Sequence, residues 1–502
     1  IFTETWERFS HYGMRALLVP YLVFDVLRDN AAFSGRGWPE ADAMHLYGAY
    51  TGLAYFFPLI GGVIADRLIG THRSMIAGAV AIALGHTVLA VSGLGALAYS
   101  DAGMAVFIAG LALIVLGTGH FKPCVSVMVG QLYAEHDARR DGGFSIFYMG
   151  INVGAALSAF VCGTLGEKVG WHYGFGAAAV GMVLGLCVYL WGRPRTLAGI
   201  GMPPEGARNL VPHFIGVFLL LSFFAGLFHF AGGPGLLARI GTAVLAAVPG
   251  TVVTVLALAT LLALCIVFVR MQQPADRGPV FTVLCFIFFN ALFWMGFEQA
   301  GSTLNLFARD NTDRMVGGWE MPFTWFQSIN PILIILLAPL FAMMWSALGR
   351  RNMNPTQSLK IAMGLFLLGA GYCVMVAAGA LAAKGVKVGI IWLSATYALH
   401  TMGELCLSPT GLSFVTRVAP AKWVSFLMGI WFLSSVVANV GGGVVAGFLR
   451  RIESGEVRLS FFGLRFGGQG DYFALFVVST FALAAVALAF TPVFRKLLHG
   501  RE

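Results

Sequence analysis

Ionisable side chains crowd the start of the first long apolar stretch, in the segment "ETWERFSHYGMR" at residues 4–15. On a helix they form one polar stripe, which consists of Glu4, Glu7, Arg8, His11, Tyr12 and Arg15. The apolar residues 16–27 that follow are too few to cross about 30 Å of hydrocarbon at about 1.5 Å per residue, so the stripe must enter the membrane. A collar of snorkelling side chains at the membrane surface would suit Glu4 but not Arg15, about three turns deeper. We expect the stripe to face the interior of a helix bundle.

Three further charges lie deep inside apolar stretches: Lys122 in "GTGHFKPCVS", Glu298 in "WMGFEQAGST" and Glu404 in "HTMGELCLSPTGLS". A charge at the centre of a bilayer costs about 2.5–3.5 kcal/mol on insertion scales, and such residues usually mark a substrate or ion pathway. A lone buried lysine needs a partner or a ligand, so a structural ion pair is the alternative for Lys122. Glu404 is the only acid deep in its stretch, which favours a functional role.

Uncharged residues of the later stretches extend the candidate site. Asn330 precedes Pro331 and could either bind a ligand or cap a helix kink. The segment "GIWFLSSVVANVGGG" adds Trp431, Phe432 and Ser435, of which the two aromatic residues could equally be ordinary packing. Pockets that tolerate varied side chains would be lined by the aromatic residues Tyr55, Trp294, Trp431 and Phe432.

The buried charges divide by sign along the chain. Arg8, Arg15 and Lys122 come from the first half, and Glu298 and Glu404 come from the second. If these helices meet at one cavity, one of its walls is cationic and the other is anionic. The complementary ligand is a short zwitterion, with a carboxylate for one wall and an ammonium group for the other. The two acids beside Arg8 can exchange protons, because the proton affinity of a carboxyl group depends on neighbouring charges.

The composition requires a membrane protein. Of 502 residues, 58% are hydrophobic and only 11% are charged, whereas soluble domains carry about 25% charged residues. The formal charge is +9, but the basic residues stand singly or in pairs in short loops, so no nucleic-acid-binding face is predicted. The seven cysteines lie far apart inside apolar stretches, without CxxC or metal-ligand spacing. We expect no metal site and no organic cofactor.

Stretches long enough to span a bilayer, about 20 residues each, recur along the whole chain. Fourteen are predicted, at 5–28, 45–66, 74–98, 103–132, 143–165, 171–192, 211–232, 243–270, 280–307, 324–348, 357–382, 388–415, 422–449 and 471–496. The fold class is therefore an all-α membrane protein.

The fourteen spans divide as six, two and six. The stretch "RPRTLAGIGMPPEGARN" breaks the chain after span six, and spans seven and eight carry almost no polar residues. We predict a six-helix bundle at 1–192, a linker with an inserted, peripheral transmembrane hairpin at 193–278, and a second six-helix bundle at 279–502. In transporters, repeats of this kind place the binding site between them at mid-membrane.

Basic residues mark every second connection, including 67–73, 139–140 and 350–360, and they recur in the tail. The positive-inside rule then places both termini in the cytoplasm. One outer loop, 450–470, contradicts this pattern with four arginines. We keep the topology because the other basic loops agree.

Several segments resemble a known family. "GGVIADRLIGTHR" at 61–73 is similar to the loop between spans two and three of the major facilitator superfamily. "ETWERFSHYGMR" resembles the ExxERFxYYG signature of the proton-dependent oligopeptide transporters, and "FYMGINVG" at 147–154 resembles their second signature. "GTGHFKPCVSVMVG", "FEQAGST", "FQSINPILIILLAPLFA" and "GELCLSPTGLS" also match. The resemblance covers nearly the whole chain and implies twelve core helices in two bundles, plus the inserted pair.

The resemblance implies that the protein takes up di- and tripeptides by alternating access, driven by a proton gradient. The implied peptide-binding residues are Arg15 and Lys122 with Tyr12 for the carboxylate, and Asn152, Asn330 and Glu404 for the amino terminus. Implied proton-coupling residues are Glu4, Glu7 and Arg8, with Glu298 as a further titrating or gating acid. The proton is the coupling ion, and a monomer in the lipid bilayer is the expected functional unit.

Two positions depart from the pattern. His11 stands where the signature usually has its first tyrosine, and because histidine titrates near neutral pH, the pH response or side-chain preference could differ. Gly48 stands where animal members have a histidine in span two, so proton coupling would depend on carboxylates. The short connection at 383–387 leaves no room for the extracellular domain of animal relatives, which favours a bacterial inner membrane.

Other functions fit the sequence less well. A proton-coupled carrier for drugs or nitrate is the nearest alternative, but Glu404 and the intact ExxER segment argue against a simple anion carrier. A membrane-embedded enzyme would need a nucleophile–base pair or metal ligands, and the sequence contains no HExxH or GxSxG motif. A channel or a receptor would not explain a stripe that holds both acids and bases.

Overall fold

The computed structural model describes residues 1–27, 29–133, 140–203, 208–236, 239, 250–460, 463 and 465–498. Its long helices are α1 (Phe2–Val23), α2 (Glu40–Ile64), α3 (Gly70–Val91), α4 (Asp101–Gln131), α5 (Arg140–Ser158), α7 (Trp171–Thr196), α8 (Val211–Phe230), α10 (Gly250–Arg270), α11 (Pro274–Phe297), α13 (Ile329–Arg350), α14 (Gln357–Ala382), α15 (Ile390–Val418), α16 (Val424–Ala446) and α18 (Gln469–Leu497). Each corresponds to one predicted span, although residues 243–249 of the eighth lie outside the described part. The all-α membrane fold is confirmed.

Ten segments of the described residues are long and apolar enough to cross a membrane. The remaining elements of the described residues are short: the helices α6 (Thr164–Lys168), α12 (Thr303–Asp310) and α17 (Leu449–Glu453), several 3-10 and π turns, and four strands. Strand β1 (Thr312–Asp313) pairs in parallel with β4 (Val388–Gly389), and β2 (Met315–Val316) pairs antiparallel with β3 (Trp319–Glu320). These strands connect the long helices and form no extended sheet in the described residues.

Two of the predicted spans are interrupted helices. α5 passes through a π turn at Ala159–Gly163 into α6, and α11 passes through a 3-10 turn at Glu298–Gly301 into α12. The second break puts Glu298 on irregular backbone in the interior, which is where functional sites often lie. A Cβ atom on Gly301 would collide with the Tyr47 hydroxyl, so glycine lets the turn lie against α2.

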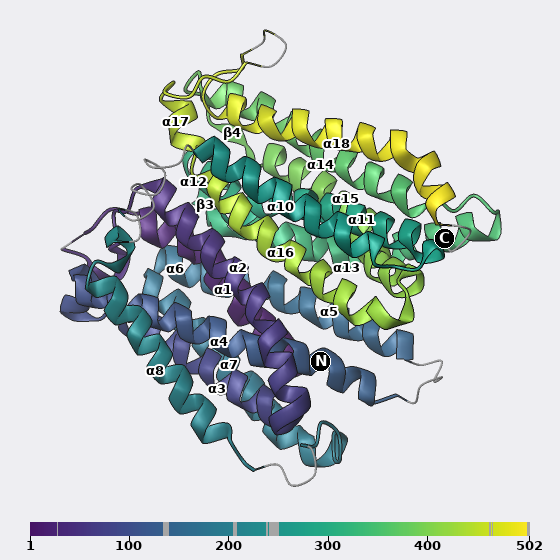
Figure 1. The fold of residues 1–502 in the computed structure, drawn as a ribbon. Coiled ribbons are helices and arrows are strands. Elements are labelled where there is room, and N and C mark those ends of the chain that lie inside the picture. Colours follow the sequence, from purple (N-terminus) through teal and green to yellow (C-terminus); the bar gives the residue numbers. More distant parts are fainter. Residues whose placement is uncertain are drawn as a thin grey trace.

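The helices form two halves in sequence order, with purple to blue segments in one and green to yellow segments in the other (Figure 1). In the first half α1 packs on α5 and α7, and in the second α14 packs on α15 and α18. The halves meet where α2 packs on α16 and α5 packs on α13. Gly48 and Gly443 allow the first of these crossings, because a Cβ on either would lie 2.9 Å from the other's Cα.

The two helices that were expected as an inserted hairpin contact different halves. α8 packs on α3 and α4, at the outer edge of the first half (Figure 1). α10 contacts α11 of the second half. Both expose apolar side chains such as Phe223 and Leu261, as expected for surfaces that face hydrocarbon, and neither contributes a lining residue to the cavity described below.

Candidate functional site

The polar stripe of α1 enters the interior of the first half. Glu4, Glu7 and Arg8 are all buried. Arg8 Nε lies 2.7 Å from Glu4 Oε1 and 2.8 Å from Glu7 Oε2. One guanidinium group therefore faces two carboxyl groups, and the cluster carries one excess negative charge when both acids are ionised. Helical spacing creates the cluster, since Glu4 and Arg8 stand one turn apart.

Arg15, at the deep end of the stripe, forms an ion pair with Glu298 on the turn that follows α11. The guanidinium group also donates to the Tyr47 hydroxyl, at 3.1 Å from Nε and 2.7 Å from Nη2. Its central carbon lies 5.5 Å from the centre of the Tyr12 ring. Both charged side chains are largely buried, so loss of either would leave an unpaired charge at high cost. The pair thus joins the two halves through the interior.

Lys122 lies in α4 beside Pro123. Its ammonium group is 3.6 Å from the centre of the Tyr55 ring, a cation–π contact. Within the described residues it has no ion-pair partner at contact distance, but Glu7 and Glu4 attract it from farther away. Lys122 therefore balances the excess negative charge of the cluster around Arg8.

Glu404 and Asn330 form the polar part of the second-half wall. Asn330 Nδ2 donates to Glu404 Oε2 at 2.9 Å and to Thr401 Oγ1 at 3.0 Å. Glu404 is buried in α15, and Asn330 lies in the first turn of α13. The amide fixes one carboxylate oxygen, and the other has no hydrogen-bond partner among the residues that the structure describes.

These groups converge on a cavity of about 240 Å³ between the halves. The predicted site residues that line it are Tyr12, Arg15, Tyr55, Asn152, Trp294, Glu298, Asn330 and Glu404. Glu4, Glu7, Arg8 and Lys122 lie outside this lining, and Lys122 reaches the cavity edge through Tyr55. Of the basic candidates, Arg15 therefore lines the cavity from the first half, and the acidic candidates Glu298 and Glu404 line it from the second half.

Three predicted residues of α16 do not line the cavity. Trp431 is buried against Gly411 of α15. Phe432 is 46% exposed, and the Ser435 carbonyl oxygen accepts a hydrogen bond of 2.8 Å from Asn439 Nδ2. The helix thus turns Trp431 toward α15 and leaves Phe432 at the surface. In this geometry these three residues of α16 lie outside the cavity lining.

His11 also lies outside the cavity lining. It is 4% exposed, and its ring packs edge-on against Tyr12 at 5.3 Å between centroids. Neither ring nitrogen has a hydrogen-bond partner in the described part of the chain. His11 thus packs beside Tyr12 and does not itself line the cavity.

Five polar lining residues escaped the sequence reasoning: Tyr148, Ser158, Gln327, Tyr397 and His400. Helical spacing would have found two of them, because Tyr148 stands one turn before Asn152 and His400 one turn before Glu404. Gln327 lies in the 3-10 turn Phe323–Ser328, which no apolar pattern predicts. Its Nε2 is buried and unpartnered in the described residues, so it can donate to a ligand carbonyl.

Hydrogen bonds also join the two halves at the end of the α5–α6 segment. Glu167 at the end of α6 accepts hydrogen bonds from the backbone amides of Phe323 and Thr324, both at 3.0 Å, and from Thr324 Oγ1 at 2.6 Å. Trp325 Nε1 donates to Thr164 Oγ1 at 2.9 Å beside them. These bonds fasten the first half to the start of the α13 segment.

Comparison with known proteins agrees with this architecture. A family model described as "POT family" matches residues 72–459. The peptide transporter YePEPT of Yersinia enterocolitica is 36% identical over 464 residues, which is 89% of this chain and 86% of that protein. A di-/tripeptide transporter of Lactococcus lactis subsp. cremoris is 34% identical over 443 residues, 86% of this chain and 85% of its own.

Solved structures of related transporters have the same fold. A crystal structure of a peptide transporter POT in complex with sulfate has a TM-score of 0.79 at 34% identity and covers 99% of this chain and 94% of its own. A mutant of a peptide transporter POT in complex with alafosfalin has a TM-score of 0.78 at 35% identity, with the same coverage. The family model covers most of the chain, and so do these relatives. The chain therefore belongs to the POT family, whose members are membrane transporters and not enzymes.

Proposed function

We propose that the protein imports di- and tripeptides together with protons by alternating access. The observation that carries the proposal is the Arg15–Glu298 ion pair, which lines the cavity and joins its two walls. Relatives named as peptide and di-/tripeptide transporters support the substrate class. The proton is the coupling ion, and no organic cofactor takes part.

A peptide fits the charge pattern of the cavity. Its carboxylate would bind Arg15, with Lys122 and Tyr12 nearby, and its amino terminus would bind Glu404. Asn152 donates its side-chain amide to the Tyr148 carbonyl at 2.9 Å, so its own oxygen is available to accept from the ammonium group. The side chains of the peptide would then contact aromatic rings of the cavity instead of fixed polar groups, which suits peptides of varied sequence.

The ion pair between Arg15 and Glu298 gives a reason for proton coupling. While Glu298 is ionised it holds Arg15 and competes with the peptide carboxylate. A proton on Glu298 removes that competitor, so peptide and proton favour the same state. The cluster of Glu4, Glu7 and Arg8 supplies a second group that can take up a proton, because it has one guanidinium for two acids.

Alternating access would proceed by movement of a bundle at 1–192 against a bundle at 279–502, connected by the segment 193–278. If both termini are cytoplasmic, as the basic loops predict, the end fastened by Glu167 is the outer one. Opening to the outside then requires the hydrogen bonds from Thr324 and Phe323 to break. We place the protein as a functional monomer in a bacterial inner membrane.

Proteoliposomes test the proposal. The purified protein should accumulate a labelled dipeptide against its concentration gradient when the outside is acidic. A protonophore should abolish this accumulation but leave exchange of labelled for unlabelled peptide intact. Concentrative uptake that is unchanged by the protonophore would disprove the coupling of peptide transport to the proton gradient.

A competition experiment separates the peptide carrier from its nearest alternative. Unlabelled di- and tripeptides should inhibit uptake of the labelled dipeptide, whereas free amino acids and nitrate should not. Stronger inhibition by nitrate or by a cationic drug than by any peptide would instead assign a different substrate to the cavity.

A further inference from the structure

The turn that carries Glu298 is held in place from the side that faces away from the cavity. In this 3-10 turn, Glu298–Gly301, the cavity is lined by Glu298, Ala300 and Gly301 but not by Gln299. Gln299 is 1% exposed, and its side chain instead contacts α16 and α18 of the second half. The turn thus has a cavity side and a packed side, and Gln299 is the polar residue of the packed side.

Both ends of the Gln299 side-chain amide are hydrogen-bonded. Nε2 donates to the Gly442 carbonyl oxygen of α16 at 3.1 Å and to the Met295 carbonyl oxygen of α11 at 3.2 Å. Oε1 accepts from the Tyr472 hydroxyl of α18 and from the Thr303 hydroxyl of α12, both at 2.9 Å. Because backbone carbonyl oxygens only accept, the amide nitrogen must be the atom that faces Gly442 and Met295. One side chain therefore ties the turn to α16, to α18 and to both helices that the turn connects.

Two tyrosines hold the backbone of the same turn. A break in a helix leaves carbonyl oxygens without their usual helical partners, and such buried groups need another donor. The Tyr372 hydroxyl of α14 donates to the Gly296 carbonyl oxygen at 2.7 Å, and the Tyr397 hydroxyl of α15 donates to the Ala300 carbonyl oxygen at 3.4 Å. Together with Gln299 they connect the turn to α14, α15, α16 and α18. The turn is thus anchored within the second half.

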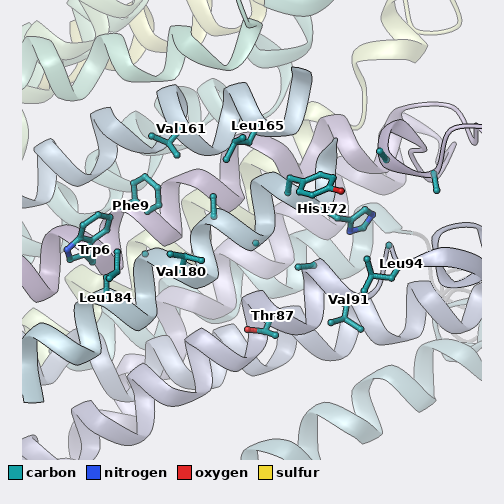
Figure 2. Close-up of a pocket in the computed structure, with 18 of the residues that line it drawn as sticks. Trp6, Phe9, Thr87, Val91, Leu94, Val161, Leu165, His172, Val180 and Leu184 are labelled. Atoms are coloured by element: carbon teal, nitrogen blue, oxygen red, sulfur yellow. The ribbon is translucent and has the colours of Figure 1, made fainter. Parts of the chain in front are cut away.

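The other interrupted helix has no charge to position. Its π turn, Ala159–Gly163, contains no ionised side chain. Val161 of that turn and Leu165 of α6 border an apolar groove of about 980 Å³ along α7 (Figure 2). Apolar side chains in such a groove need no exact position, because the hydrophobic effect has no preferred direction. A carboxyl group that pairs with a guanidinium group does need one, since their hydrogen bonds depend on geometry.

Two anions compete for Arg15 in the proposed function. Ionised Glu298 pairs with the guanidinium group, and the peptide carboxylate has to displace Glu298 before it can bind there. The ion pair joins the two halves, so its strength depends on where each half holds its own partner. If the turn moved freely, Glu298 would lie against Arg15 for less of the time and would be a weaker competitor.

We propose, on the basis of the function proposed above, that Gln299 is a positioning residue that keeps Glu298 in contact with Arg15. Gln299 does not line the cavity, so it acts only through Glu298. Leucine is similar in size but cannot hydrogen-bond, so Gln299→Leu would leave the Gly442 carbonyl oxygen and the Tyr472 hydroxyl without this partner. The loosened turn should let a peptide bind more tightly while Glu298 is ionised, whereas a general folding defect would weaken binding.

Dipeptide affinity at alkaline pH tests the proposal in the wild type, Gln299→Leu, Glu298→Gln and the double variant. Gln299→Leu should bind a labelled dipeptide about three- to tenfold more tightly than wild type, the range that corresponds to one hydrogen bond. In the Glu298→Gln background the same substitution should change the affinity by less than about twofold, because no carboxylate is left to position. A gain of the same size in both backgrounds would overturn the proposal.

Two further variants separate positioning from packing. Tyr472→Phe removes one donor to Gln299 but keeps the ring, so it should give a smaller gain in the same direction, and it replaces Gln299→Leu if that variant does not fold. Ser358→Ala removes a buried hydrogen bond of 2.9 Å between α14 and α18 outside the turn and should leave dipeptide affinity unchanged. Unchanged or weaker binding in both Gln299→Leu and Tyr472→Phe would overturn the proposal.

A thiol reaction tests the turn without any peptide. A single cysteine at Ala300, which lines the cavity, should react at least about threefold faster with a thiol reagent when Gln299→Leu is added, because local opening of the turn exposes it. A single cysteine at Ser158, in the lining from the first half, should react at the same rate in both proteins. If wild type binds no dipeptide, the proposed function fails and this rate alone decides the role of Gln299. An unchanged rate at Ala300 would show that Gln299 does not hold the turn.

Discussion

Arg15 of α1 and Glu298 of the turn after α11 are 283 positions apart in the chain and form a buried ion pair. Tyr47 of α2 binds the same guanidinium group. The pair therefore links the two halves at the cavity, and any ligand anion that binds Arg15 has to compete with Glu298. This competition makes the pair sensitive to both protons and substrate.

Glu298→Gln should uncouple peptide transport from the proton gradient. The amide has nearly the same shape but cannot ionise, so Arg15 is free whether or not protons are supplied. We expect gradient-driven uptake to fall by at least about tenfold, or about 1.4 kcal/mol, while exchange across the membrane stays within about twofold. Glu320→Gln, at an exposed acid in β3, is the matched control and should transport normally. Equal loss of uptake and exchange would show a structural role instead.

The sequence predicted the long helices well because each needs about 20 apolar residues to cross the bilayer. It also predicted that the α1 stripe enters the interior, since its apolar remainder is too short to span. The interruption at Glu298–Gly301 was not predicted, because the apolar residues before and after it were interpreted as one continuous span. Gly301, which accommodates Tyr47, makes a contact between distant segments that no local pattern shows.

The charged residues of the candidate site were predicted well, because a charge in hydrocarbon is costly. The uncharged residues were predicted less well, because they carry no such cost. Arg15, Glu298 and Glu404 were recognised as candidates because a charged residue inside a membrane span usually has a functional role. Phe432 gave no such indication, because an aromatic residue in a span can pack against lipid as readily as against a ligand. In the structure its side chain is exposed. Gln327 was missed because its place depends on the packing of a short turn.

Lys122→Ala should weaken binding of all peptides by a similar factor. The ammonium group neighbours the Arg8 cluster and the Tyr55 ring, so it would act on the peptide backbone carboxylate and not on side chains. We expect about tenfold weaker binding, about 1.4 kcal/mol, for Ala-Ala and Leu-Leu alike in a thermal-shift titration. A loss confined to one of these peptides would contradict a backbone contact. Lys360→Ala, at a lysine outside the cavity lining, serves as the control.

Glu404→Gln should reduce the preference of the protein for peptides with a free amino terminus over N-acetylated peptides. The wild-type carboxylate is oriented by Asn330 and would attract the ammonium group, so N-acetylated dipeptides should bind much more weakly than unmodified ones. In the variant this attraction is lost, and the ratio of the two affinities should fall by about tenfold. The measurement is competition of both peptides with a labelled dipeptide. An unchanged ratio would show that Glu404 does not bind the amino terminus of the peptide.

Glu167→Ala should loosen the contact between the halves at the end of the α5–α6 segment and make the cavity easier to reach from that side. It removes three hydrogen bonds to Phe323 and Thr324, of a type worth about 1.5–3 kcal/mol when one partner is charged. A single cysteine at Ser158, which lines the cavity, should then react faster with a thiol reagent added from that side, in a background without the native cysteines. Lys168→Ala removes an exposed ion pair of 3.9 Å and a cation–π contact of 5.8 Å with Trp319, but no hydrogen bond to Phe323 or Thr324, and should react like the parent protein. Similar rates in both variants would mean that other contacts hold this end closed.

His11→Phe tests whether the unexplained residue of the stripe acts on substrate. The ring is buried, lies outside the cavity lining and leaves both nitrogens unpartnered in the described residues. A buried unsatisfied polar group costs about 1–3 kcal/mol, so phenylalanine should raise the unfolding temperature in detergent while dipeptide affinity stays within about twofold. Tyr12→Phe, one position along and in the lining, should instead weaken binding without this stabilisation. A loss of dipeptide affinity in His11→Phe as large as that in Tyr12→Phe would show that His11 takes part in substrate binding.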